Sequence, residues 1–331
     1  MKRINIVFCG TGDFALPTLL KLIYWATNDV LFKLVLVVTQ PDKPKGRNLK
    51  IENTRIKEIA LQNNIPVMQI EQSFCDEEIQ YIKSFQPDMI VTVAFGEYLN
   101  KKMRTMCPYG AINLHPSLLP LHRGPDPIRS TILAKDECCG NTVFFLNAGI
   151  DAGNIILQTK YKIKDLPFNL NYSNLLNFLS EKGADDIVFS IKEIISRALT
   201  FKELKVSFPE QEHSKATFSK KINKTLICAD FELSGDEFIN RINAYSYTPG
   251  YYCIFRGKRL KLFCAEIVNS VNNIQYPIIK EIIKNKGFVI TLKDSDLLIK
   301  EVQYENSVKM SAWQFNVGYR LVVGEKFEHN I

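Results

Sequence analysis

The chain has 331 residues, of which 46% are hydrophobic and 23% are charged. These values exclude a fibrous, collagen-like or largely disordered protein and are typical of a folded globular chain. The net charge is +7, and residues 191–331 carry +5 of it, with 21 Lys and Arg against 16 Asp and Glu. This excess favours an anionic partner such as nucleic acid, but a solvated lysine-rich surface explains it equally well.

The length is about twice that of a usual single domain, so we expect one large and one small domain. Residues 1–9 hold two basic residues and an apolar run too short for a signal peptide. No apolar stretch of about 18 residues follows, so we expect a cytoplasmic protein without a membrane segment. The eight cysteines form no C-x-x-C pair and lack zinc-finger spacing, which favours reduced, mostly packed thiols.

The first part of the chain alternates buried strands with amphipathic helices. Strands are predicted at 4–9, 34–39, 66–69, 89–94, 110–114, 141–146 and 155–162. Helices are predicted at 14–25, 54–63, 75–85 and 171–197, the last with an interruption near Gly183 as an alternative. This alternation predicts an α/β domain over residues 1–197, with a Rossmann-like, doubly wound and mostly parallel sheet.

Residues 198–216 contain Pro209 and a polar run, and they predict a linker. The pattern then changes to short strands with tight turns and one helix, predicted at 251–255, 260–265, 287–291, 297–302 (strands) and 235–244 (helix). We expect residues 217–331 to form a smaller C-terminal, OB-like β-barrel. Such barrels often bind nucleic acid, although this inference is an analogy of fold.

The first candidate site is the turn Gly10-Thr11-Gly12-Asp13-Phe14-Ala15, which fits the G-x-G-x-x-A pattern of a dinucleotide site. A nicotinamide site also needs an acidic residue at the end of the second strand. That strand ends at Thr39-Gln40-Pro41, and Asp42 comes only after the proline. A tight turn between strand and helix is therefore the favoured interpretation.

The second candidate is the loop from Thr39 to Arg47, which contains two prolines and the basic residues Lys43, Lys45 and Arg47. It directly follows the carboxyl end of a strand, where ligands of open α/β sheets bind. A stiff basic loop at that edge can meet a phosphate-bearing substrate. An exposed turn with solvated lysines is an equally good explanation from these residues alone.

The strongest candidate combines Asn113, His115 and Asp151. Asn113 and His115 are two positions apart at the end of a strand, so both side chains leave from one face. An amide donor and an imidazolium can stabilise an oxyanion together, and an aspartate against the imidazole fixes its tautomer. Asp151 lies in a glycine-flanked loop from which it can supply that carboxylate. These residues predict an enzyme that acylates amines.

Three other interpretations of this region compete with that prediction. His115 can be a buried, hydrogen-bonded histidine, which is the commoner fate of a single histidine. His115, His122 and Asp151 can hold a metal, although their spacing matches no recognised zinc site. Ser117 can act as a nucleophile, although it lacks the G-x-S-x-G elbow. The stiff, proline-bounded loop after His115 instead favours a small apolar pocket for a flat ligand.

These residues resemble the family of 10-formyltetrahydrofolate-dependent formyltransferases. The matching motifs are Asn113-Leu114-His115 leading into Ser117-Leu118-Leu119-Pro120, Arg123-Gly124 with Pro127-Ile128, and Gly149-Ile150-Asp151-Ala152-Gly153. The resemblance covers nearly the whole chain and is strongest from residue 4 to 160. It implies formyl transfer from 10-formyltetrahydrofolate without a metal, with Asn113, His115 and Asp151 as catalytic residues. It also implies a folate pocket formed by the strand 89–94 and by Phe95, Gly96, Ser117, Leu118, Leu119 and Pro120.

The acceptor is implied by features outside these motifs. The 39–47 loop is similar to the one with which family members acting on methionine-charged initiator tRNA meet the acceptor arm. By that similarity Lys43, Lys45 and Arg47 bind tRNA, and the C-terminal barrel also matches those members. Amino-sugar formyltransferases are the competing branch. We expect a monomer whose partners are initiator Met-tRNA and the folate.

Three departures from the family pattern affect the expected tRNA contacts. Gly12 and Asn100 stand where proline is common, and residues 244–250 keep the pattern at the start of the barrel only loosely. None of the three lies among the residues that are expected to carry the chemistry. They leave the contacts of the second domain with tRNA open.

Overall fold

The computed structural model describes residues 3–28, 31–45, 50–72, 74–197, 199–270 and 276–328. The chain divides into two compact units, and neither is a single continuous stretch of sequence. The first unit comprises residues 1–127, 138–165 and 176–219. The second comprises residues 128–137, 166–175 and 220–331. The domain limits expected at 197 and 217 stay a prediction.

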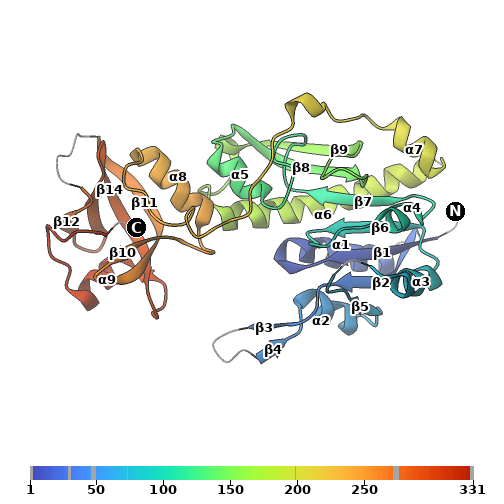
Figure 1. Ribbon diagram of the computed structural model, residues 1–331, viewed down its shortest axis with the longest axis horizontal. Coiled ribbons are helices and arrows are strands. Elements are labelled where there is room, and N and C mark those ends of the chain that lie inside the picture. Colours follow the sequence, from blue (N-terminus) through green and yellow to red (C-terminus); the bar gives the residue numbers. More distant parts are fainter. Residues whose placement is uncertain are drawn as a thin grey trace. The chain divides into compact units, whose positions relative to one another are not determined.

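The described residues of the first unit form a seven-stranded sheet (Figure 1). In sheet order its strands are β5 (Val67–Gln69), β2 (Phe32–Thr39), β1 (Ile4–Gly10), β6 (Met89–Val93), β7 (Ala111–His115), β8 (Cys138–Phe145) and β9 (Ile155–Lys162). The first five run parallel, whereas β8 and β9 are antiparallel to their neighbours. The predicted Rossmann-like, mostly parallel sheet is confirmed.

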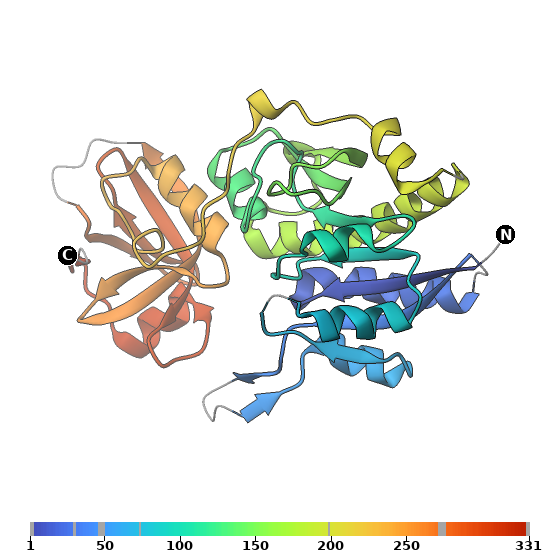
Figure 2. The same cartoon turned by 45° about the vertical axis from the view of Figure 1, so that its right-hand side comes forward.

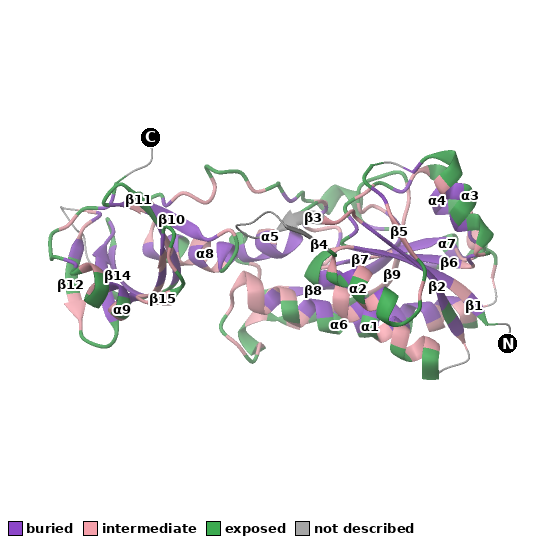
Figure 3. Cartoon of the chain, turned by 90° about the horizontal axis from the view of Figure 1, so that it is seen from below, coloured by how far each residue is buried: buried purple, intermediate pink, exposed green. Residues whose placement is uncertain are grey.

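Helices cover both faces of this sheet. They are α1 (Gly12–Asn28), α2 (Arg55–Gln62), α3 (Asp76–Ser84), α4 (Lys101–Thr105), α6 (Tyr172–Ser196) and α7 (Phe201–Ser207), with 3-10 turns η1 (Ile163–Asp165) and η2 (His213–Lys215). Figure 3 shows α1 and α6 on one side of the strands and α3 and α4 on the other. Apolar residues of α3 and α4 join the buried core on the sheet, including Ile79, Ile82 and Met103, and so does Leu99, just before α4.

The strand order reverses between β1 and β6. Strands β2 and β5 are added in turn on one side of β1, and the chain then crosses over and places β6 on the other side of β1. Such a switch point opens a crevice outside the carboxyl ends of the strands, where α/β proteins bind ligands. The carboxyl ends of β1, β6 and β7 lie at this edge. The sheet therefore places the end of β7, with His115, at the expected position of a site.

Helix α6 is continuous, so the alternative of an interruption near Gly183 is wrong. A Cβ at Gly183 would lie 2.5 Å from Leu114 Cδ2 and 3.3 Å from Asn141 Nδ2. The glycine therefore allows the helix to approach β7 and β8 closely and does not break it.

A hairpin that the sequence did not predict follows β2. Its strands β3 (Lys43–Lys45) and β4 (Lys50–Glu52) pair antiparallel, and the hairpin extends away from the sheet (Figures 1 and 2). The residues between the two strands, 46–49, lie outside the described part of the chain. The basic loop expected at 39–47 is thus partly a two-stranded ribbon.

The second unit contains an all-antiparallel sheet. Within its described residues the strand order is β10 (Tyr251–Phe255), β11 (Lys258–Ser270), β14 (Ser295–Tyr304), β13 (Gly287–Thr291) and β12 (Ile279–Ile283), with β15 (Met310–Ser311) beside β14. Its helices are most of α5 (Pro127–Leu133), α8 (Gly235–Tyr245) and α9 (Ala312–Tyr319). The long strand β11 has several irregularities in its pairing with β14, a feature that lets a sheet curl. The unit is consistent with the predicted small barrel.

All eight cysteines lie in described residues and are free thiols, as expected. Burial raises the pKa of Cys107 to about 12 and that of Cys139 to about 11, so both stay protonated near neutral pH. Within the described residues, no helix is long and apolar enough to span a bilayer.

Candidate active site

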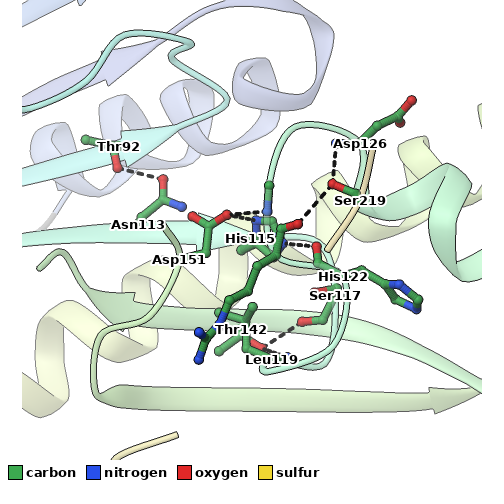
Figure 4. A network of polar contacts seen from close by, with 12 residues as sticks. Thr92, Asn113, His115, Ser117, Leu119, His122, Asp126, Thr142, Asp151 and Ser219 are labelled. Atoms are coloured by element: carbon green, nitrogen blue, oxygen red, sulfur yellow. Dashed lines mark hydrogen bonds and ion pairs between the residues drawn. The ribbon is translucent and has the colours of Figure 1, made fainter. Parts of the chain in front are cut away.

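Strand β7 presents Asn113 and His115 from one face, as predicted (Figure 4). Thr92 lies opposite Asn113 on the neighbouring parallel strand β6. The Thr92 hydroxyl donates to Asn113 Oδ1 at 2.6 Å. Because the amide oxygen is occupied in this way, the Nδ2 group of Asn113 is the one left to donate to a bound molecule.

His115 is 5% exposed, and each of its ring nitrogens faces a polar group. Nε2 lies 2.9 Å from the carbonyl oxygen of His122, and a carbonyl can only accept, so Nε2 carries the proton. Nδ1 lies 3.6 Å from Asp151 Oδ2. That separation is longer than a hydrogen bond. The His122 carbonyl therefore fixes the tautomer, a role that the sequence had assigned to Asp151.

Asp151 reaches the site from the turn after β8 (Figure 4). Its backbone has φ 46°, a left-handed conformation uncommon for residues other than glycine. Its Oδ2 accepts the N–H of Gly124 at 2.7 Å. The neighbouring Gly153 has no room for a side chain, because a Cβ there would lie 1.6 Å from the Phe145 carbonyl oxygen. The turn thus places the carboxylate beside His115 Nδ1.

The three side chains together offer an amide donor, an imidazole nitrogen and a carboxylate at one edge of the sheet. The Asn113 amide, together with His115 Nδ1 when both ring nitrogens carry a proton, can stabilise negative charge on a carbonyl oxygen under attack. The carboxylate can accept a proton from the attacking group. The arrangement suits acyl transfer to an amine. It needs neither a metal ion nor a covalent intermediate.

The loop from Ser117 to Pro120 is tied down by hydrogen bonds to β8 and β9. Thr142 Oγ1 donates to the Ser117 carbonyl at 2.7 Å and accepts the Leu119 N–H at 3.1 Å. Gln158 Nε2 donates to the Leu119 carbonyl at 2.9 Å. Leu118 is half-buried and Leu119 is buried. The loop is therefore rigid enough to form one wall of a ligand site.

Phe95 and Gly96 follow β6 at the same edge of the sheet. Phe95 is buried in the core, with its ring centroid 6.1 Å from that of Phe74. Gly96 has φ 86°, and a Cβ there would lie 2.7 Å from Gln40 Nε2. Because the Phe95 side chain is used by the core, this segment can offer mainly its backbone to a ligand.

Of the basic residues expected to meet the acceptor, Lys43 and Lys45 lie on β3. Arg47 lies outside the described residues. The base of the hairpin is well defined, because Asp42 accepts the Thr54 N–H at 3.2 Å and lies 2.5 Å from Lys57 Nζ. These contacts fix where the ribbon leaves the seven-stranded sheet.

The alternative interpretations find little support in the geometry. Among the described residues, no group of three or more His, Cys, Asp or Glu side chains is placed to hold a metal ion. The Ser117 hydroxyl donates to the Leu121 carbonyl at 2.6 Å, so it faces no general base. In the Gly10–Asp13 turn, Thr11 Oγ1 accepts the Gln40 N–H at 3.2 Å, which ties that turn to the segment directly after β2.

Several residues that orient the site were missed in the sequence. They are Thr92, Thr142, Gln158 and Gln211. The sequence carries no signal for the first three, because their contacts depend on strand register and turn conformation. Gly124 belongs to a motif noted in the sequence, but its hydrogen bond to Asp151 was not predicted. Gln211 lies in the polar run that had been interpreted as part of a linker.

Comparison with known proteins identifies the family of the chain. The formyl transferase family model matches residues 2–177, and the model of the family's C-terminal domain matches residues 221–320. The chain belongs to the formyl transferase family. The resemblance noted in the sequence is thereby confirmed, and the match to both family domains covers most of the chain.

Curated members of the family match along almost their full length. The methionyl-tRNA formyltransferase of Clostridium beijerinckii is 32% identical over 99% of this chain and 99% of the relative. That of Caldicellulosiruptor saccharolyticus is 35% identical over 97% of this chain and 99% of the relative.

Solved structures share the fold at lower identity. The N-formyltransferase from Helicobacter canadensis, in complex with folinic acid and dTDP-3-aminofucose, has a TM-score of 0.62 and 19% identity, covering 89% of this chain and 98% of that one. HypX from Aquifex aeolicus, in complex with tetrahydrofolic acid, has a TM-score of 0.58 and 13% identity, covering 98% of this chain and 49% of that one. At these identities the likeness concerns the formyl transferase fold.

Proposed function

We propose that the chain transfers the formyl group of 10-formyltetrahydrofolate to the α-amine of methionyl-initiator tRNA. The products are N-formylmethionyl-tRNA, which serves translation initiation, and tetrahydrofolate. The observation that carries this proposal is the similarity to methionyl-tRNA formyltransferases over 97–99% of the chain, together with the convergence of Asn113, His115 and Asp151.

The donor is assigned from the family and from the site. Solved structures of the same fold contain tetrahydrofolic acid or folinic acid. We assign the folate to the edge formed by β6, Phe95, Gly96 and the loop from Ser117 to Pro120. Its flat ring system would lie against the rigid loop and the backbone after β6, within reach of the end of β7.

The reaction follows from the orientation of the side chains. The neutral amine of methionine attacks the formyl carbon, so a new C–N bond forms while the bond to the folate nitrogen breaks. The amide of Asn113 and, when protonated, His115 Nδ1 donate to the oxyanion that develops on the formyl oxygen. Asp151 accepts the proton lost by the amine, and this proton ends on the leaving folate nitrogen. No step consumes another reactant.

The acceptor is assigned to the β3–β4 hairpin and to the more basic second unit. We expect Lys43, Lys45 and Arg47 to contact the phosphates or the acceptor end of the tRNA. A monomeric, cytoplasmic enzyme fits this role. Both properties are expectations of the proposal.

An acceptor assay tests the proposal. Purified chain is incubated with 10-formyltetrahydrofolate and either methionyl-initiator tRNA, uncharged tRNA or an amino-sugar nucleotide, and formylated product is quantified. We expect product with methionyl-tRNA only. Transfer to the amino sugar without transfer to methionyl-tRNA would move the chain to the other branch of the family.

A further inference from the structure

The groups around His115 come from two turns that are distant in sequence. The carbonyl of His122 and the N–H of Gly124 belong to the turn at 120–126, and Asp151 belongs to the turn after β8. His115 itself is fixed by the sheet. The relative position of the two turns therefore decides how the Asp151 carboxylate lies against the imidazole.

A segment at 211–219, here called the strap, pairs with the first of these turns. The Arg123 N–H donates to the Thr217 carbonyl at 2.9 Å, and the Ser219 N–H donates to the Arg123 carbonyl at 2.7 Å. The His122 N–H donates to Thr217 Oγ1 at 2.8 Å. The strap thus runs beside the turn like a short strand and supports it along its length.

Gln211, at the start of the strap, joins the first turn to the second. Its Nε2 donates to the carbonyls of Asp151 and Gly153 at 2.9 and 2.8 Å. Its Oε1 accepts Nη2 and Nε of Arg123 at 2.7 and 3.2 Å. A primary amide has two N–H donors and one oxygen with two lone pairs, so every capacity of this side chain is used. Gln211 is 5% exposed, so these bonds lie away from solvent.

Two residues with a left-handed backbone lie in the turns that the strap contacts. His122 has φ 58° and Asp151 has φ 46°. The carbonyl of His122 contacts His115 Nε2, and the carboxylate of Asp151 lies beside His115 Nδ1. Left-handed conformations of such residues persist only where the surrounding structure holds them. The contacts of the strap lie directly on these two turns.

The groups that Gln211 joins also explain why a glutamine stands at this position. Arg123 is 5% exposed, and burial lowers the pKa of its guanidinium while the charge of Asp151 raises it. The side chain at position 211 must therefore accept hydrogen bonds from a cation and donate hydrogen bonds to two carbonyl groups at the same time. Glutamate lacks the donors and lysine lacks the acceptor. Glutamine satisfies both sides without adding a charge beside Asp151.

We propose that Gln211 is a positioning residue for the reaction, which holds the Asp151 turn against the Arg123 turn and so fixes the carboxylate beside His115. This inference rests on the proposed function, because it assigns Asp151 to the reaction. Gln211 touches no reacting atom and acts only through the two turns.

Gln211→Met keeps the volume of the side chain and removes all four hydrogen bonds. We expect kcat for methionyl-tRNA formylation to fall by about 10- to 100-fold, the loss that a displacement of about 1 Å produces in a catalytic group. The KM values for folate and tRNA should stay within about twofold. Gln211→Glu, which keeps the acceptor for Arg123 but cannot donate to the carbonyls, should be impaired to a similar degree.

A double-mutant cycle with Asp151→Asn separates positioning from general destabilisation. If Gln211 acts through Asp151, Gln211→Met should lower kcat by less than about twofold in the Asp151→Asn background. Ile191→Val, a substitution of a buried residue on α6, is the control: it should lower Tm and leave kcat unchanged. Rates are measured well below the unfolding temperature of each variant.

Two results would overturn the role of Gln211. One is an equal loss of kcat in both backgrounds, and the other is a wild-type kcat for Gln211→Met. A wild-type enzyme that forms no formylmethionyl-tRNA in the same assay would instead contradict the proposed function, and this inference with it.

Discussion

Asn113 and His115 each use one polar atom to hold their position and keep another for the substrate. The amide oxygen of Asn113 accepts from Thr92, and Nε2 of His115 donates to the His122 carbonyl. The remaining atoms, Asn113 Nδ2 and His115 Nδ1, are therefore oriented before any substrate arrives. Donors fixed in advance cost no reorganisation when charge develops, and this is the main source of their catalytic effect.

Thr92→Val tests this orientation at a residue that takes part in no chemical step of the proposed mechanism. Valine keeps the branched shape but cannot donate to Asn113 Oδ1, so the amide loses the contact that fixes which end faces the site. We expect kcat for formylation to fall roughly 3- to 30-fold, as for weakening one oxyanion donor, with little change in Tm. Steady-state kinetics with methionyl-tRNA measure the effect.

Thr18→Val is the matched control for that substitution. Thr18 is also fully buried, and its hydroxyl has no hydrogen-bond partner among the described residues. Its replacement should leave kcat unchanged and should not lower Tm. Equal kinetics for Thr92→Val and the wild type would contradict the role of Thr92 in orienting the Asn113 amide.

The sequence predicted the site residues Asn113 and His115 but not their hydrogen-bond partners. The spacing of Asn113 and His115 on a strand was sufficient to predict that both face one side. The donor to Asn113 depends on the register between β6 and β7, and the acceptor for His115 depends on a left-handed residue at 122. Neither property has a local sequence signal.

Among the elements, the β3–β4 hairpin owes its position to contacts of Asp42. The carboxylate accepts the Thr54 N–H just after β4, Gln69 Nε2 from β5 and Lys57 Nζ from α2. The bond with Lys57 lowers the pKa of Asp42, so the carboxylate is charged at neutral pH. One side chain therefore links both ends of the hairpin to the sheet and to a helix.

Asp42→Ala should loosen the hairpin without touching the folate edge. We expect kcat/KM for methionyl-tRNA to fall by about 10-fold, with an unchanged KM for 10-formyltetrahydrofolate. Arg47→Ala should give the same pattern if the hairpin meets tRNA phosphates. The control is Asp76→Ala, because Asp76 is also ion-paired, to Lys102, but lies on α3. A larger effect on folate KM than on tRNA kinetics would contradict this role of the hairpin.

Helix α6 carries a buried acid where it meets β8 and β9. Asp186 is 7% exposed and accepts from Thr159 Oγ1 at 2.9 Å and Asn141 Nδ2 at 3.2 Å. Burial raises its pKa above the ordinary 3.8, although the two hydrogen bonds oppose the shift. The folded chain thus binds this proton more tightly than the unfolded chain. The associated stability is complete below the ordinary pKa and is lost as pH rises through the raised value.

Asp186→Asn should therefore stabilise the protein at pH 7 and much less at pH 4. The amide keeps an oxygen for both donors and removes the buried charge, and it supplies a donor beside Asn141 Oδ1, which has no partner among the described residues. We expect Tm at pH 7 to rise by roughly 2–4 °C, the shift for about 1 kcal/mol in a domain of this size. Calorimetry at both pH values checks the result; a lower Tm at pH 7 would show that the charge is needed.

Elements with a strong apolar period were predictable, and those defined by long-range contacts were not. The strands β1, β2, β6 and the helix α8 follow their patterns closely. The hairpin β3–β4 was missed because lysine and proline residues carry no strand signal. The continuity of α6 at Gly183 depends on how closely it packs on β7 and β8, which the helix sequence does not reveal.

At the scale of the whole molecule, each compact unit gathers segments that are separated in sequence. Residues 128–137 and 166–175 group with the second unit, although most of their neighbours in sequence belong to the first. Composition could predict a large α/β part and a small β part because the apolar period changes between them. Composition could not predict that residues 128–137 and 166–175 group with the second unit, because only tertiary contacts define that grouping.

The rate of formyl transfer to methionyl-tRNA by the wild type and by His115→Ala tests whether this site carries out the proposed reaction. Single-turnover reactions with labelled 10-formyltetrahydrofolate report the chemical step, and circular dichroism checks that both proteins are folded. We expect the wild type to form formylmethionyl-tRNA and His115→Ala to be slower by about 10²-fold or more. A wild type that forms no product, or a folded His115→Ala that matches the wild-type rate, would contradict the account.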